Sequence, residues 1–429
     1  MADAPSTRSR PLTRRPARSR PEDSKRAIAS IPLFTLESRI KRALRRHLKE
    51  LGFTKATNGA LMPPSEGKAT LRSMHSAQRA QRLETEAAFV AEQWPLLQCH
   101  FASGAEVVPS AITPELELVE AGTWQSNLFR LASLTWSVPV SQGYGRRMRF
   151  LVWDRHNDKL IGLIALGDPV FNLRVRDRYI GWTSDDRKKR LVGMLDAFVL
   201  GSLPPYNRLL GGKLVASLIR SIEVRDTFRQ RYHTTKGIIS QKRKHAELVA
   251  VTTTSALGRS SVYNRVRLGS TTYLKPLGYT EGWGHFHIPE SVFEEVRVYL
   301  RRRRRKYAKG FKFGDGPNWR LRALRLAMGL VGLRPELLRH GIKREVFITE
   351  LATNACQILN GKRKRPKYDD LLSVADIAKL ARERWIIPRA ERCPDFRSLT
   401  VEQIGALLTA KYIDGPDAGA ETTYDIGAA

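Results

Sequence analysis

The stretch RFLVWDRHNDKLIGLIALGDPV, residues 149–170, decides the fold of this chain. Its two apolar runs, residues 149–154 and 160–170, are separated by the turn-forming residues 157–159. Two apolar runs around a short polar turn are typical of a β-hairpin. We interpret RYIGW, at residues 178–182, as a third strand. The stretch therefore predicts the beginning of a β-sheet.

Beyond the hairpin, helical and strand patterns alternate. SDDRKKRLVGMLDAFVL (184–200) is predicted as a helix capped by Ser184. GGKLVASLIRSIEVRDTFRQRY (211–232) is predicted as one amphipathic helix entered through two glycines. AELVAVTTTSAL (246–257) has the β-branched composition of a buried strand. This order predicts the α/β (α+β) class, with a mixed central sheet.

Helical patterns flank this core on both sides. Apolar residues recur at helical spacing in residues 34–51 and 73–97. Residues 291–307, 319–333, 347–361 and 371–385 are predicted as helices after the core. We therefore expect six parts: a disordered basic arm (1–28), a helical N-terminal region (29–106), the α/β core (107–289), a basic helix and hinge (290–316), a helical C-terminal region (317–414) and a disordered tail (415–429).

The composition limits the class of protein. The 429 residues include 74 Lys and Arg against 42 Asp and Glu, which gives a formal net charge of +32. This charge favours an acidic partner. The three cysteines are widely spaced, which excludes a disulfide scaffold and fits a reducing compartment. Apolar runs stay far below the roughly 20 residues of a membrane span, so we expect a cytoplasmic protein without membrane contact.

The densest basic cluster lies between residues 297 and 325, with twelve Lys or Arg and one acid. Arginine forks bind phosphate in a bidentate manner, so the cluster favours a nucleic-acid contact. Tyr307, Phe311, Phe313 and Trp319 add rings on which bases could stack. A solvated helix face and a site for an acidic protein remain alternatives. The residues predicted to bind nucleic acid are Arg301, Arg302, Arg303, Arg304, Arg305, Lys306, Lys309 and Lys312.

Two polar clusters follow strand-like segments and predict a central pocket. Residues beyond the end of a central strand are favoured places for binding in open α/β sheets. The first cluster enters a helix through glycines, where backbone N–H groups can approach a phosphate; a purely structural glycine turn is the alternative. The predicted pocket residues are Tyr206, Asn207, Arg208, Gly211, Gly212, Lys213, Arg259, Ser260, Ser261, Tyr263, Asn264 and Arg265.

Other catalytic signatures are missing from the sequence. His285 and His287 would share a face of a strand, but no HExxH or CxxC spacing supplies further ligands. Neither a GxSxG motif nor a Walker phosphate loop is present. We therefore predict no metal site and no cofactor, and leave open whether the protein is an enzyme.

The order of elements resembles the GNAT acetyltransferase fold. The segment Arg208-Leu209-Leu210-Gly211-Gly212-Lys213 is similar to the turn that holds the acyl-CoA pyrophosphate in that family, with Lys213 where the last Gly or Ala belongs. YLKPLGYTE, residues 273–281, is similar to a late tyrosine- and glycine-containing segment of the family. The resemblance covers residues 150–288 and implies a GNAT-like core.

Several phrases together resemble the DruA family of the bacterial Druantia anti-phage defence systems. They are YNRLLGGKLVA, LVAVTTTSALGRSSVYNRV, YLKPLGYTEGWGHFHIP, LLRHGIKREVF and ARERWIIPRAER. The resemblance runs from about residue 150 to 392. It implies a defence protein that works with a large helicase and other system components, and it implies no catalytic residue.

The leading functional hypothesis is thus a defence component that engages nucleic acid, DNA in preference to RNA, through its basic surface. An enzyme is the first alternative: an acyl-CoA- or nucleotide-dependent transferase with Arg208, Gly211 and Gly212 on the pyrophosphate. The second alternative is a scaffold whose basic face binds an acidic partner protein. A homo-oligomer is compatible with each of the three.

Overall fold

The computed structural model describes residues 32–57, 61–62, 64, 67–236, 243–285, 288–305, 307 and 317–409. The predicted arm 1–28 and tail 415–429 lie outside these residues. The chain divides into two compact units. The smaller unit falls within residues 1–48 and 288–335, and the larger unit within residues 49–287 and 336–429.

A seven-stranded mixed sheet forms the centre of the larger unit and confirms the predicted α/β class. Its strand order is β12-β13-β9-β6-β5-β4-β3. β6 and β9 are parallel, and every other pair in this sheet is antiparallel. The strands are β3 (Pro114–Leu118), β4 (Arg147–Asp154), β5 (Lys159–Gly167), β6 (Met194–Ser202), β9 (Ala250–Thr254), β12 (Lys275–Tyr279) and β13 (Glu345–Glu350).

The predicted hairpin is confirmed as β4 and β5, and the predicted buried strand as β9. Both β4 and β5 are buried along most of their length, because helices cover both faces of the sheet. The other strands among the described residues form three two-stranded ladders: β1 (Thr54–Lys55) with β2 (Leu61–Met62), β7 (Thr234–Lys236) with β8 (Arg243–His245), and β10 (Arg267–Leu268) with β11 (Thr271–Thr272).

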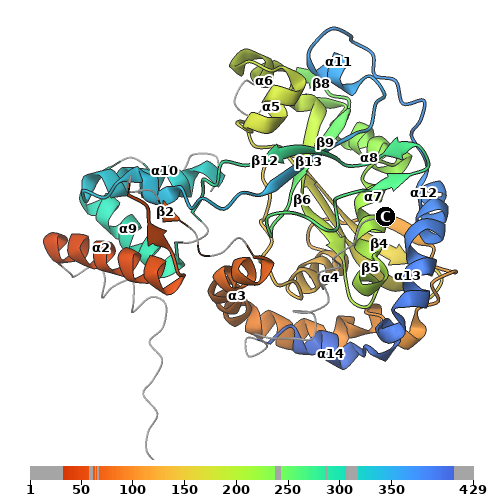
Figure 1. Ribbon diagram of the computed structural model, residues 1–429, viewed down its shortest axis with the longest axis horizontal. Coiled ribbons are helices and arrows are strands. Elements are labelled where there is room, and N and C mark those ends of the chain that lie inside the picture. The colour runs from red at the N-terminus through yellow and green to blue at the C-terminus, as the bar shows by residue number, and fades with distance from the viewer. Residues whose placement is uncertain are drawn as a thin grey trace, which may run out of the picture. The chain divides into compact units, whose positions relative to one another are not determined.

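Helices pack on both faces of the large sheet, and Figure 1 shows them on its two sides. One face packs against α7 (Gly211–Leu218), α8 (Ile222–Tyr232), α12 (Val374–Ala381) and α13 (Ile387–Arg392). On the opposite face, α3 (Lys68–Leu97), α4 (Trp124–Ser133) and α14 (Val401–Ala406) cover the half formed by β3 to β6. α5 (Arg174–Ile180) and α11 (Ala355–Leu359) cover the half formed by β9, β12 and β13.

Two sequence interpretations near the hairpin were wrong. Residues 178–182 end helix α5 instead of forming a strand, and Gly181 closes that helix in the left-handed region at φ 82°. The predicted helix 184–200 splits into α6 (Ser184–Arg190) and strand β6. A central strand is apolar on both faces and so carries no alternation, which makes it hard to distinguish from a buried helix by pattern.

Two sequence interpretations of later segments were also wrong. The predicted helix 211–232 is two helices, because the Ser221 side chain accepts a hydrogen bond from the Val224 N–H and starts α8 anew. The predicted helix 347–361 consists of strand β13 and the short helix α11. β13 lies between β9 and β12 and is therefore, like β6, a central strand without a polar face.

The smaller unit consists of three helices in its described part: α2 (Leu33–Glu50), α9 (Glu290–Arg302) and α10 (Pro317–Leu330). The predicted apolar face of α2 is confirmed, since Leu36, Ile40, Leu44 and Leu48 are all buried. Ion pairs tie α2 to α9, with Arg39 Nη2 lying 2.7 Å from Glu295 Oε1. Trp319 of α10 packs edge-on against Phe293 of α9.

Candidate functional site

The five consecutive arginines, residues 301–305, do not continue helix α9 as the sequence pattern predicted. The helix ends at Arg302, and Arg304 adopts the left-handed conformation at φ 50°. The Arg304 N–H donates to the Arg301 carbonyl at 2.9 Å, and the Arg305 N–H donates to the Leu300 carbonyl at 2.9 Å. These two bonds are those of a Schellman C-cap. We call residues 301–305 the arginine cap.

Arg304 occupies the position of the cap that glycine normally takes. A left-handed conformation costs an L-residue roughly 1–2 kcal/mol, and arginine has no short polar side chain to offset that cost. Because the chain turns there, the guanidinium groups of Arg301, Arg304 and Arg305 extend into solvent from the end of a helix. A helix C-terminus itself favours cations, since it carries a partial negative charge.

The carboxylates in the described part of the smaller unit are already paired. Glu37, Glu290, Glu294 and Glu295 each form an ion pair with an arginine, among them Glu37 with Arg303 at 2.9 Å. The Tyr299 hydroxyl also donates to Glu37 at 2.7 Å, and these contacts lower the pKa of Glu37. Within the residues that the structure describes, Arg301, Arg304 and Arg305 form no ion pair. Lys306, Lys309 and Lys312 lie outside the described residues.

Most residues of the first predicted pocket cluster, residues 206–213, make contacts that stabilise the fold. The Tyr206 hydroxyl is buried and donates to Asp154 at 3.0 Å. Arg208 forms an ion pair with Asp395 at 3.0 Å. A Cβ on Gly211 would lie 2.5 Å from the Tyr206 carbonyl oxygen, so glycine is required for this close approach. Asn207 is exposed.

The second cluster, residues 258–265, lies against the first. Lys213 Nζ donates to the Asn264 carbonyl oxygen at 2.6 Å, and a Cβ on Gly212 would lie 3.0 Å from Val262. The Tyr263 hydroxyl donates to the Leu200 carbonyl at 2.7 Å. Leu200 belongs to the part of β6 that runs beyond its pairing with β9, which ends at Ala197 and Thr253. Tyr263 therefore occupies the place where these two strands separate.

The remaining residues of the second cluster have different partners and different exposure. The Ser260 N–H donates to Glu345 Oε2 at 3.0 Å, and the Asn264 amide donates to the same oxygen at 2.9 Å. The Ser261 hydroxyl accepts from Lys68 at 3.0 Å. Arg259 and Arg265 are exposed. The structure thus brings the two clusters together through packing and hydrogen bonds, whereas their role in binding stays a prediction.

Lys213 has an unusual electrostatic environment. Burial, together with the neighbouring cations Arg265 and Arg384, lowers its pKa to about 8. Lys213 Nζ also lies 5.8 Å from the centre of the Trp385 ring. Sequence reasoning missed Arg384 and Trp385, because they lie in a π-helical turn, Arg382–Ile386, far along the chain from Lys213.

A partly buried carboxyl on the opposite face of the sheet was also missed. Asp196 of β6 accepts a hydrogen bond from the Thr252 hydroxyl at 2.6 Å, across the parallel β6–β9 pair. Burial raises the pKa of Asp196 to about 6, against the opposing effects of the Thr252 hydrogen bond and of Arg176. The sequence did not indicate Asp196 because residues 184–200 were interpreted as a helix.

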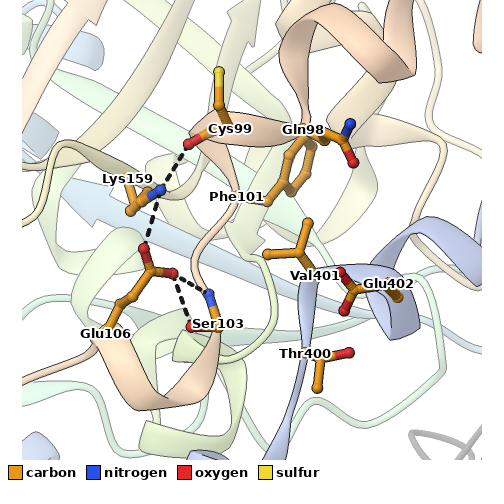
Figure 2. A pocket seen from close by; sticks show the side chains of 9 residues that line it. All are labelled: Gln98, Cys99, Phe101, Ser103, Glu106, Lys159, Thr400, Val401 and Glu402. Carbon is orange, nitrogen blue, oxygen red and sulfur yellow. Dashed lines mark hydrogen bonds and ion pairs between the residues drawn. The ribbon is translucent and has the colours of Figure 1, made fainter.

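An open pocket of about 330 Å³ lies elsewhere in the larger unit, beside the N-terminal end of β5 (Figure 2). Three of its polar side chains, those of Lys159, Ser103 and Glu106, are joined by hydrogen bonds and an ion pair. Lys159 Nζ donates to the Cys99 carbonyl at 2.8 Å and lies 3.1 Å from Glu106. The Ser103 N–H and hydroxyl both donate to Glu106, which closes a capping box. These contacts give the polar lining a structural role.

Neither a metal cluster nor a membrane helix is found in the described part of the chain. No three His, Cys, Asp or Glu side chains gather there in a way that could hold a metal ion. Of the histidine pair considered from the sequence, His287 lies outside the described residues. No described helix is long and apolar enough to cross a bilayer.

Comparison with known proteins gives two matches. The family model described as "Druantia protein DruA" matches residues 65–361. A curated protein of the same description from Escherichia coli (strain UMEA 4076-1) is 54% identical over 361 residues, which cover 84% of this chain and 89% of that protein. No solved structure matches the chain.

Proposed function

This chain belongs to the DruA family, components of the Druantia anti-phage defence systems, and we propose that within such a system it engages nucleic acid through the arginine cap. DNA is the preferred form in this proposal. The other system components, including a large helicase, are its expected partners.

The observation that carries the proposal is the unmatched charge of three residues of the arginine cap, Arg301, Arg304 and Arg305. All carboxylates in the described part of the smaller unit are already paired, and Arg301, Arg304 and Arg305 are not. The chain keeps an arginine at the strained position 304, where glycine would relieve the backbone. A backbone outlier of this kind supports a functional role for the residue that adopts it. A few such contacts to phosphates would give non-specific dissociation constants of about 10⁻⁴ to 10⁻⁶ M.

For the larger unit, the proposal is a GNAT-like core that serves as a scaffold. The observed order supports it: a hairpin, then β6, a glycine turn into α7, and β9 and β12 later in the chain. The acyl-CoA alternative has less support. Arg208, the arginine of the expected pyrophosphate turn, already forms an ion pair with Asp395.

A salt series on the full chain tests the nucleic-acid proposal. Binding of double-stranded DNA, single-stranded DNA and RNA is measured by fluorescence anisotropy for the wild type and for an Arg301→Gln, Arg304→Gly, Arg305→Gln variant. Glycine at 304 suits the left-handed backbone, so this variant removes charge without disturbing the cap. For every phosphate that the variant no longer neutralises, the log–log salt slope on duplex DNA should fall by about 0.9.

The control is Arg392→Gln, which removes an exposed arginine from α13 of the larger unit. Its salt slope should equal that of the wild type. An unchanged slope in the triple variant would contradict the role of the arginine cap. Absence of binding near physiological salt would instead support the alternative of an acidic protein partner.

A further inference from the structure

Three cations of the larger unit come together at the start of α7: Lys213, Arg265 and Arg384. Lys213 Nζ contacts the carbonyl oxygen of Asn264, the residue before Arg265, at 2.6 Å. It also lies 5.8 Å from the ring centre of Trp385, the residue after Arg384. The two arginines are exposed, whereas Lys213 is partly buried. The three residues therefore come from three separate segments, and both arginines are near enough to Lys213 to lower its pKa.

These cations have no counter-charge among the residues that the structure describes. The guanidinium groups of Arg265 and Arg384 make no hydrogen bond or ion pair there, and Lys213 donates to a neutral carbonyl. The nearby carboxylates are used elsewhere: Glu345 accepts from Ser260 and Asn264, and Asp395 binds Arg208. The positive charge of this cluster is thus uncompensated.

Such an arrangement of like charges is electrostatically unfavourable by itself. Lys213 lies in the first turn of α7, where the helix dipole disfavours a cation. The lowered pKa of Lys213, caused by burial and by the two arginines, shows the same repulsion. Arg265 is held in the left-handed region at φ 57°, and Arg384 lies in a π-helical turn, a feature frequent at functional sites. An anion bound among the three side chains would remove the repulsion.

We propose that Lys213, Arg265 and Arg384 form a binding site for a phosphate group. Two arginine forks and one lysine point charge are the donor set that proteins use for phosphate. The phosphate belongs either to a small molecule such as pyrophosphate or to the end of a nucleic-acid strand. This site is separate from the arginine cap and does not depend on it.

The test uses the full chain carrying the three arginine-cap substitutions, so that Arg301, Arg304 and Arg305 cannot contribute to binding. Inorganic pyrophosphate is titrated by calorimetry at constant ionic strength. Short single-stranded oligonucleotides with either a 5′-phosphate or a 5′-hydroxyl are compared by anisotropy. The site variants are Lys213→Met, Arg265→Asn and Arg384→Gln. Asparagine tolerates the left-handed backbone of position 265.

Each site variant should weaken binding about tenfold or more, the effect expected when one charge-assisted hydrogen bond is removed. The control Arg392→Gln should bind like its parent. Saturable pyrophosphate binding that depends on the three residues identifies a small ligand. Dependence seen only with the 5′-phosphorylated strand identifies a nucleic-acid end. If neither probe shows this dependence, the proposal is wrong, whatever the arginine cap does.

Discussion

Arg305 donates its backbone N–H to the carbonyl oxygen of Leu300 at 2.9 Å, and this bond ends α9 with Arg304 in the left-handed conformation. The relationship fixes the direction in which the arginine cap leaves the helix. It also separates the backbone role of position 304 from its charge, because glycine can fulfil the first without the second.

Replacement of Arg304 by glycine should stabilise the end of α9. Relief of the left-handed strain stabilises the helix end, and the greater entropy of glycine in the unfolded chain offsets part of this effect. The net gain in the free energy of unfolding is roughly 0.5–1 kcal/mol. Hydrogen exchange of the α9 amides measures this local stability. Arg305→Gly, at a position without positive φ, should bring no gain. Faster exchange in Arg304→Gly would contradict the strain argument.

Removal of the Tyr206 hydroxyl should destabilise the larger unit. Tyr206→Phe deletes the donor to Asp154, a carboxylate that is fully buried and that otherwise accepts from the Thr113 and His156 N–H groups. Leaving a buried carboxylate oxygen without its partner should cost about 1–3 kcal/mol in urea unfolding. Tyr279→Phe, at an exposed position, is the matched control and should leave the unfolding curve unchanged.

Buried His75 should make the fold sensitive to acid. Burial, with a smaller contribution from Arg344, lowers the pKa of His75 to about 4. The unfolded chain therefore binds a proton between pH 6.5 and 4 that the folded chain does not, so stability falls as the pH drops through this window. The full effect amounts to about 3 kcal/mol.

Urea unfolding between pH 7 and 4 measures this sensitivity. His75→Gln should flatten the dependence on pH, because glutamine does not titrate. His156→Gln removes an exposed histidine and should retain the wild-type dependence. Equal slopes in the wild type and in His75→Gln would rule out His75 as the acid-sensitive group.

For Asp196, the pH dependence of stability should have the opposite sign to that expected for His75. Its pKa is raised to about 6, so the folded chain holds a proton above pH 4 that the unfolded chain has released. Stability from this group is lost as the pH rises through 6. Asp196→Asn keeps the acceptor for the Thr252 hydroxyl and should raise the thermal midpoint at pH 7.5 by a few degrees, at roughly 2–4 °C per kcal/mol. At pH 5 the variant and the wild type should differ less.

The sequence predicted those parts of the fold in which local pattern and tertiary position agree. The β4–β5 hairpin has a turn and two apolar runs, and α2 has one apolar face, so each could be recognised alone. β6 and β13 could not, because central strands lose their alternation when both faces are covered. Residues 178–180 form the end of helix α5, and Gly181 caps that helix in the left-handed conformation. The sequence does not specify this conformation of Gly181.

For the candidate sites, too, local sequence pattern predicted the individual segments but not which distant segments lie together. The positions of the arginine run and of the two polar clusters were visible in the sequence, as were the phrases that indicated the family. The meeting of Lys213 with Arg384 depends on how α12 and the turn after it lie along α7, which no local pattern encodes. The end of α9 at Arg302 was missed because arginine is a good helix former.

The order of synthesis has a consequence for the sheet. β12 and β13 are antiparallel neighbours, yet the second segment of the smaller unit, residues 288–335, is inserted between them in the sequence. The Gly341 N–H donates to the Gly282 carbonyl at 3.2 Å, so the two ends of this insertion are held together. β9 keeps one edge unpaired until β13 leaves the ribosome, which is a non-local and therefore slow closure. A nascent chain that stalls within the insertion would expose that edge to aggregation.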